Sequence, residues 1–175
     1  MRTLGKVATA AALWEGFWYF HRKAERIRAF KMAREVATAI GKPLLVIGVP
    51  EGEYPCGDVT LDLRDTGECK NFVQGSVESI PFPDKHFGAA FCSHVLEHVC
   101  DPHTALKELY RVADKVFIVY PQWWTFCAWT LPGHTWLVTE KTGPDKEPRY
   151  SFTRIRASNC NKATRFGRLL SGELR

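Results

Sequence analysis

Short apolar runs recur along the middle of this 175-residue chain and constrain its fold more than any other feature. The first, residues 44–49, has no polar side chain, which is typical of a β-strand buried on both faces. Further runs follow at residues 59–63, 71–73, 88–92 and 116–120, of which 71–73 is a weak one. Because such strands alternate with crossover segments in parallel sheets, the sequence predicts an α/β fold with a mostly parallel, Rossmann-like sheet.

Two further segments have helical spacing, one before the first run and one between the last two runs. Residues 24–40 place apolar side chains at helical intervals with Lys and Arg opposite, and Gly41 and Pro43 predict the end of this helix. A second helix is predicted before the last run, with Asp101 as N-cap and Pro102 in the first turn. Its expected buried stripe consists of Ala105, Leu106, Leu109 and Val112.

The chain begins with an unusually apolar stretch, residues 4–20, which also has a helical pattern. Lys6, Glu15 and Gly16 interrupt it, and it is shorter than the roughly 20 apolar residues of a transmembrane helix. No small-residue cleavage site follows it, so a signal peptide is not expected. Three alternatives remain open: a helix lying in a membrane interface, a helix docked on a protein partner, or a helix packed on its own domain.

Charge is distributed unevenly along the chain. Residues 1–43 and 141–175 each carry a net charge of +6, whereas residues 44–140 carry −7, within an overall charge of +5. Basic ends favour anionic partners such as lipid headgroups or nucleic acid, although solvated surfaces produce the same pattern. No nucleic-acid-binding motif accompanies the charge.

The six cysteines have neither the CxxC pattern nor a Cys/His spacing, so no metal site is expected. A chain of this size does not need disulfides for its stability. The cysteines are therefore expected to be mostly free thiols of a protein from an intracellular, reducing compartment.

Ligands of parallel α/β sheets bind beyond the carboxyl ends of the strands. A glycine after the first strand lets the backbone approach a ligand, and an acid after the second strand can hold ribose hydroxyls. Residues after the third and fourth strands can enclose a base. The sequence offers these candidates in order: Gly48, Gly52, Asp62, Ser76, Val77, Ser93 and His94.

Residues 75–121 resemble the central block of the class I S-adenosylmethionine (SAM)-dependent methyltransferases, in particular the type 11 group. The resemblance is carried by Ile80-Pro81-Phe82, Asp84, Phe87, Val95-Leu96-Glu97-His98-Val99, Asp101-Pro102, Ala105-Leu106 and Arg111-Val112. It implies SAM as cofactor, held by the candidates above, and an unidentified methyl acceptor. It requires no catalytic base; His134, in the segment after the fifth strand, is a candidate.

Several positions depart from the family pattern. Val46 and Pro50 replace an acid and a glycine of the first glycine-rich motif, and Gly88 stands where the family has an Asp. Only residues 50–57 separate the first two strands, too few for the usual crossover helix. Glu51 and Glu53 also put negative charge where a cofactor carboxylate would lie.

Two functions follow from these features. One is methyl transfer from SAM; the other is a catalytically inactive, methyltransferase-like structural or interaction subunit, anchored to a membrane or complex through residues 4–20. The predicted organisation is a helical extension over 1–43, a methyltransferase-like domain over 44–155, with one late strand at 149–155, and a basic tail over 156–175.

Overall fold

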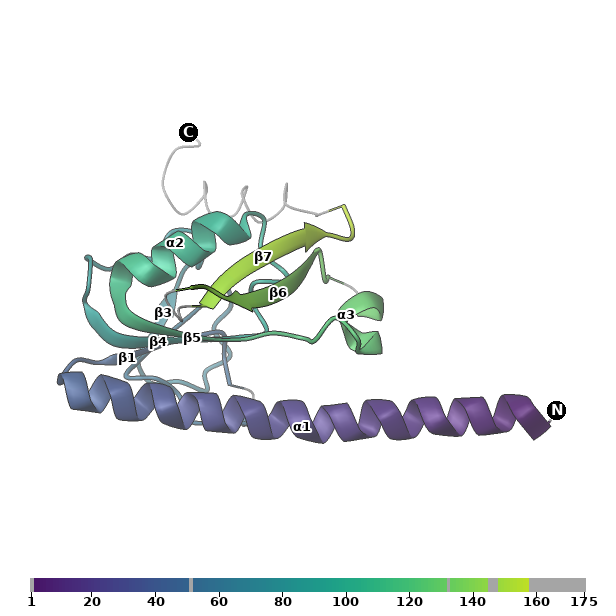
Figure 1. Cartoon of the computed structure of the whole chain (residues 1–175). Coiled ribbons are helices and arrows are strands. Elements are labelled where there is room, and N and C mark those ends of the chain that lie inside the picture. Colours follow the sequence, from purple (N-terminus) through teal and green to yellow (C-terminus); the bar gives the residue numbers. More distant parts are fainter. Residues whose placement is uncertain (1, 51, 132, 145–147, 158–175) are drawn as a thin grey trace.

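The computed structural model describes residues 2–50, 52–131, 133–144 and 148–157. Five parallel strands form the central sheet in the order β3-β2-β1-β4-β5 (Figure 1), which confirms the predicted Rossmann-like α/β fold. They are β1 (Leu44–Ile47), β2 (Val59–Asp62), β3 (Phe72–Gln74), β4 (Phe87–Ser93) and β5 (Ala113–Val119).

One long helix, α1 (Arg2–Ile40), runs under the sheet, and its amino-terminal half extends beyond the strands (Figure 1). The apolar stretch 4–20 and the predicted helix 24–40 are therefore parts of one continuous helix. Gly41 ends it in the left-handed region with φ 74°, and its amide donates to the Thr38 carbonyl. Within the described residues, no helix is both long and apolar enough to span a membrane.

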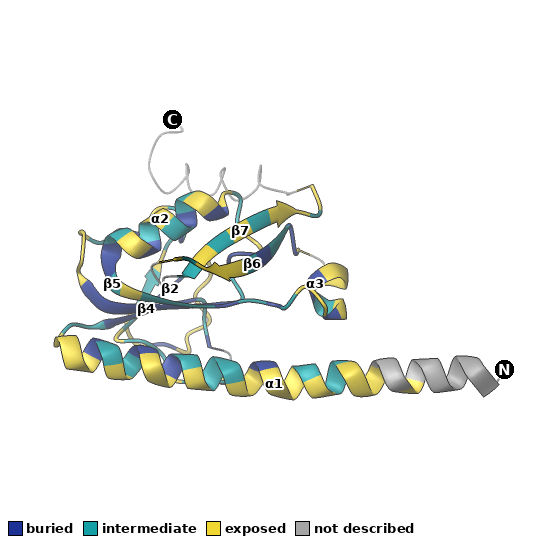
Figure 2. Ribbon diagram, in the orientation of Figure 1, coloured by how far each residue is buried: buried dark blue, intermediate teal, exposed yellow. Residues whose placement is uncertain are grey.

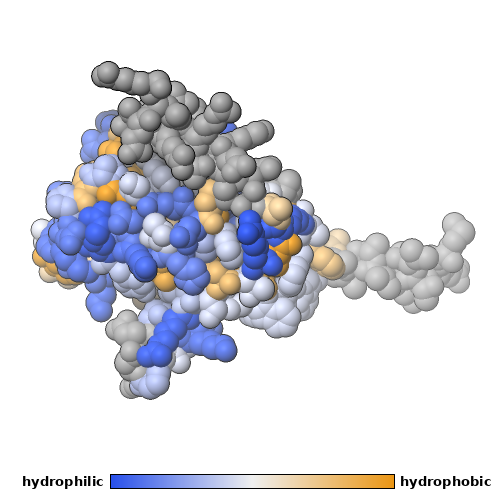
Figure 3. Space-filling model, turned by 90° about the horizontal axis from the view of Figure 1, so that it is seen from above, coloured by the Kyte–Doolittle hydropathy of each residue, from blue (hydrophilic) through white to orange (hydrophobic). Residues whose placement is uncertain are grey.

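The opposite face of the sheet carries α2 (Pro102–Val112) and an antiparallel hairpin of β6 (Trp136–Thr142) and β7 (Pro148–Arg154). The Asp101 carboxylate caps α2 by accepting from the His103 and Thr104 amides, as predicted. On this face, the described residues in view are mainly hydrophilic (Figure 3). A short helix, α3 (Phe126–Thr130), lies between β5 and the hairpin. The late strand was predicted; β6 and α3 were not.

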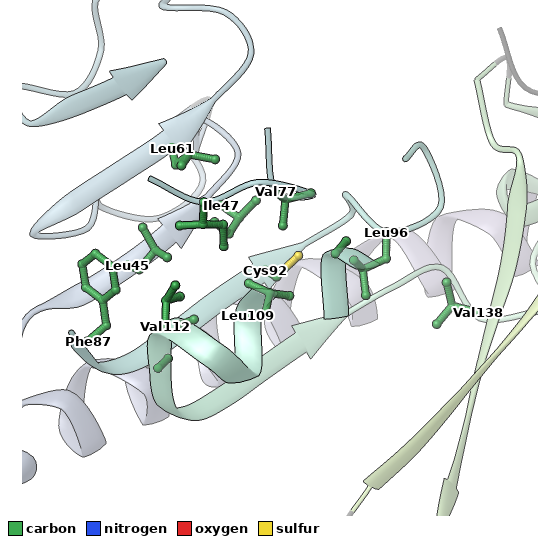
Figure 4. Packing of buried hydrophobic residues seen from close by; sticks show 14 residues of the cluster. Leu45, Ile47, Leu61, Val77, Phe87, Cys92, Leu96, Leu109, Val112 and Val138 are labelled. Atoms are coloured by element: carbon green, nitrogen blue, oxygen red, sulfur yellow. The ribbon is translucent and has the colours of Figure 1, made fainter. Parts of the chain in front are cut away.

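Apolar side chains form one core on each side of the sheet, so the central strands β1 and β4 are wholly buried, whereas the edge strands β3 and β5 are only partly buried (Figure 2). The larger core lies between the sheet, α2 and the hairpin (Figure 4) and includes Leu45, Phe87, Leu109 and Val138. The smaller core joins α1 to the other face through Phe30, Ala33, Ala37, Leu44, Val46, Ala89 and Phe91.

Gly88 explains how α1 comes so close to β4. A Cβ at this position would lie 3.0 Å from the Ala37 Cα and 3.2 Å from the Lys42 Cβ. The first of these neighbours is helix backbone, which cannot rotate away. An Asp at this position, as in the family pattern, would need space that α1 occupies.

Replacing Gly88 by Ala is expected to destabilise the protein by about 1–3 kcal/mol, the usual cost of overpacking a core. Gly16→Ala is the control, because nothing lies within 4 Å of a Cβ added there. Within a helix this second change is expected to stabilise by up to about 1 kcal/mol. Urea unfolding measures both; equal effects would contradict the close packing of α1 on β4.

Candidate cofactor site

The register of the sheet brings three of the predicted residues to one edge. Ile47 pairs with Leu61 on one side and with Cys92 on the other. The residues that follow these three are Gly48, Asp62 and Ser93. They therefore lie side by side at the carboxyl ends of β1, β2 and β4, where parallel sheets bind ligands.

Gly48 turns the chain sharply at this edge. Its φ is 89°, which favours glycine, and its amide donates to the Leu61 carbonyl over 2.9 Å. Asp62 holds the same turn from the next strand: one carboxylate oxygen accepts from the Val49 amide at 3.0 Å, and the other from the Arg64 amide at 3.2 Å. Each oxygen has a further lone pair, so the half-buried carboxylate can still accept from a ligand hydroxyl.

The end of β4 presents two buried polar atoms. Ser93 is 7% exposed; its Oγ makes no hydrogen bond of ideal geometry, but the Tyr54 hydroxyl lies close enough to interact with it. The neighbouring His94 adopts a φ of 54°, unusual for a residue with a side chain, and its buried Nε2 also lacks a hydrogen bond within the described chain. Buried polar atoms of this kind are costly unless a ligand or water satisfies them.

The other predicted cofactor residues have different surroundings. Val77 is buried in the larger core, and the Ser76 Oγ accepts from the Glu78 amide at 3.2 Å. Gly52 lies in the β1–β2 connection, where its amide donates to Glu68. These three residues therefore shape the loops around the edge; none has a partnerless polar side chain aimed at a ligand.

The β1–β2 connection contains no helix in its described residues, as its length predicted. The Glu53 carboxylate forms an ion pair with Arg26 of α1 at 2.6 Å, so its charge is neutralised by α1. Glu51 lies outside the described residues.

Tyr54, in the same connection, fills space on the α1 side of the sheet. Its ring stacks on Phe30 and meets Phe91 edge-on, with centroid distances of 5.5 and 5.1 Å. Burial raises the pKa of its hydroxyl to about 12, so the side chain is neutral at physiological pH. An aromatic ring thus covers part of the sheet in place of a crossover helix.

Cysteine bonding differs from the sequence-based expectation. Cys56 and Cys69 form a disulfide, with Cα atoms 5.7 Å apart, and Cys100 is also disulfide-bonded; Cys92 and Cys127 are free. The prediction of mostly free thiols was therefore wrong. The short β1–β2 connection brings Cys56 beside the β2–β3 loop, a proximity that the spacing of cysteines along the chain does not reveal.

Arg111, in the segment that resembles the methyltransferase family, forms a structural clamp between α2 and the segment before β4. The Arg111 guanidinium bonds both oxygens of Glu108 at 2.7 Å and donates to the carbonyls of Ile80 and Phe82 and to Asp84. Glu108 in turn accepts from the Ile80 amide. The segment between β3 and β4 is thereby fixed against α2. Sequence analysis missed this role, although an acid three residues before an Arg on a helix is a recognisable signal.

His134, the candidate base, is buried with 3% exposure, and this burial lowers the pKa of its imidazole. Its ring packs edge-on against His98, with centroids 4.7 Å apart. His134 therefore lies inside the protein, packed against the segment that follows β4.

Comparisons with known proteins agree with this fold. Residues 50–116 match the family model described as "Methyltransferase domain". Curated relatives include the ubiquinone/menaquinone biosynthesis C-methyltransferases UbiE of Psychromonas ingrahamii, 30% identical over 113 residues, and Vibrio cholerae, 40% identical over 52 residues. These matches cover 63% and 29% of this chain, but only 38% and 20% of the relatives' own lengths.

Solved structures also resemble part of the chain. A SAM-dependent methyltransferase of Thermotoga maritima has 20% identity and a TM-score of 0.42, covering 61% of this chain and 56% of its own. One of Mesorhizobium loti has 11% identity and a TM-score of 0.42, covering 73% and 63%.

The parallel sheet with its flanking helices matches the Rossmann-like fold of class I methyltransferases, in a shortened form. The matched segment, residues 50–116, resembles the methyltransferase domain of the type 11 group of SAM-dependent methyltransferases.

Arg111→Met is expected to lower the free energy of unfolding by about 2–3 kcal/mol, because several charge-assisted hydrogen bonds are lost at once. Lys107→Met, one helical turn earlier on the exposed side of α2, is the matched control and is expected to change it by less than about 0.5 kcal/mol. Urea denaturation monitored by tryptophan fluorescence compares the two. A small effect of Arg111→Met would show that the clamp does not stabilise the fold.

Proposed function

We propose that this chain binds SAM at the edge formed by Gly48, Asp62 and Ser93 and transfers its methyl group to an acceptor. The observation that carries the proposal is the alignment of these residues at the carboxyl ends of adjacent parallel strands. The names of the curated relatives describe carbon methylation in quinone biosynthesis, which supports methyl transfer as the class of reaction. Because the match covers a minor part of those relatives, the acceptor stays open.

The residues present fit the nucleoside half of SAM. The positive φ of Gly48 lets a ligand approach the backbone, and Asp62 keeps lone pairs for the ribose hydroxyls. His94 offers an Nε2 that makes no hydrogen bond within the described protein, and the Ser93 hydroxyl is close only to that of Tyr54. When bound, SAM would supply an activated methyl group, and the chain's contribution would be to hold the acceptor in line with it.

Asp62→Asn is expected to weaken SAM binding at least tenfold, because a neutral amide replaces the charged acceptor of the ribose hydroxyls. Asp65→Asn is a matched control: Asp65 also accepts from the backbone amide two residues later, as Asp62 does. Calorimetry with SAM and with S-adenosylhomocysteine measures both variants. Absence of binding by the unmodified chain at millimolar ligand would exclude the proposed cofactor.

The second candidate function is an inactive structural subunit. The tightly held β1–β2 connection favours it, because Glu53, Tyr54 and Cys56 each bind this connection to another part of the protein. In a methyltransferase this segment must accommodate the methionine end of SAM. The calorimetric experiment separates the two functions, since the subunit alternative requires no SAM affinity.

Either function is compatible with an anchoring surface on α1. Leu13, Phe17 and Phe20 share one side of the helix and are 62–71% exposed. α3 packs on the opposite side of α1, where the Trp18 and Trp124 ring centroids lie 5.6 Å apart and the Phe126 amide donates to Glu15. The exposed aromatic residues at this end of the molecule, here called the α1–α3 patch, also include Trp14, Trp123, Phe126 and Trp129.

We propose that the α1–α3 patch binds the interface of an anionic lipid bilayer. Aromatic side chains are favourable in that interface, and the exposed Lys23 and Arg28 follow them on the same helix. An apolar patch of this kind is rare on surfaces that face only water.

A double change, Phe17→Ser with Phe20→Ser, is expected to reduce binding to phosphatidylglycerol vesicles at least tenfold, because each buried Phe contributes about 1.5–3 kcal/mol. Met32→Ser is the control, since Met32 is an exposed apolar residue farther along α1. Co-sedimentation with vesicles measures the binding. Equal losses in both variants, or no binding by the parent chain, would contradict a lipid-binding role.

A further inference from the structure

Glu97 is a buried carboxylate that the proposed methyl transfer does not use. The residue is 1% exposed, and neither side-chain oxygen accepts a hydrogen bond from the described residues. A buried charge without hydrogen bonds is strongly unfavourable unless a cation compensates it. Its backbone carbonyl accepts from the Thr135 and Trp136 amides, which fixes the segment after β4 against the start of β6.

Histidine rings surround this carboxylate. One ligand atom each of Glu97, His98 and His134 lie within 4.8 Å of one another, close enough to share a single metal ion. His94 approaches from another side, with its Nδ1 3.2 Å from a Glu97 oxygen. His98 is exposed, so the group is open to solvent on one side.

The hydrogen bonds of two rings prepare them as ligands. The His98 Nδ1 lies 3.1 Å from the Gly133 carbonyl oxygen, and the His134 Nδ1 lies 3.3 Å from that of Ala128. Because a carbonyl oxygen only accepts, each Nδ1 must carry the proton, and each Nε2 then keeps a lone pair. Histidines that bind metals are oriented by the same kind of bond on the opposite nitrogen.

We propose that Glu97, His98 and His134 bind a divalent transition-metal ion, with Zn²⁺ as the ion that best matches this set. Two imidazoles and one carboxylate form a known type of zinc site, which leaves a fourth position for water or a substrate atom. The ion balances the Glu97 charge and joins the segment after β4 to the segment before β6.

The proposal goes beyond the sequence-based expectation of no metal, which considered local Cys and His spacing. Here the third ligand is far along the chain from the other two, and the fold brings them together. Asp62 is not part of this group, whereas His94 of the proposed cofactor site lies against Glu97, so zinc binding is measured in the absence of SAM.

The direct test is calorimetric titration of the full chain, stripped with EDTA, with ZnCl₂. One ion per chain is expected, and His134→Ala is expected to weaken binding at least 100-fold. His103→Ala is the control, because this exposed histidine of α2 is outside the group. Equal losses in both variants, or no zinc binding by the parent chain, would overturn the proposal.

Glu97→Gln provides a test that does not depend on the folding of His134→Ala. It keeps the side-chain volume and removes the charge, so the metal-free protein is expected to stay folded. Zinc is expected to raise the midpoint of thermal unfolding of the parent chain but not of Glu97→Gln. An equal rise in both would show that Glu97 is not a ligand and that its charge is compensated by His94 instead.

Discussion

Both faces of the five-stranded sheet must be covered, and the rest of the structure depends on how α1 covers one of them. Parallel sheets are stable only when apolar side chains on both faces are removed from water. Phe30, Ala33 and Ala37 provide this cover, with Gly88 allowing the helix backbone to approach β4 directly. With this close contact, α1 provides the layer that crossover helices provide in a larger domain.

This close cover changes what the β1–β2 connection has to do. The connection no longer needs a helix to protect the sheet, because α1 and the Tyr54 ring already do so. It is held instead by Arg26, by the disulfide to Cys69 and by the Asp62 carboxylate. The same residues that shorten the fold therefore determine the shape of the edge where the cofactor is proposed to bind.

Much of the fold could be predicted because burial leaves a clear pattern. The central strands appear as uninterrupted apolar runs, and Asp101-Pro102 marks the start of α2. The prediction for β5 began three residues late, because Asp114 and Lys115 are polar residues on an edge strand. The five residues of α3 are too few to show periodicity.

Site residues could be predicted only where the sheet itself positions them. Gly48, Asp62 and Ser93 follow strands, so parallel pairing brings them to one edge. The Cys56–Cys69 disulfide and the group around Glu97 depend on contacts between loops, and no local pattern in the sequence records such contacts.

The length of α1 also has a mechanical consequence. At 1.5 Å per residue its 39 residues extend for about 58 Å, and Phe17 lies about 30 Å along the axis from Ala37. One end is clamped to the sheet, while the other carries exposed aromatic side chains. Whatever binds the amino-terminal half of this helix is therefore held at a set distance from the edge of the sheet where the cofactor is proposed to bind.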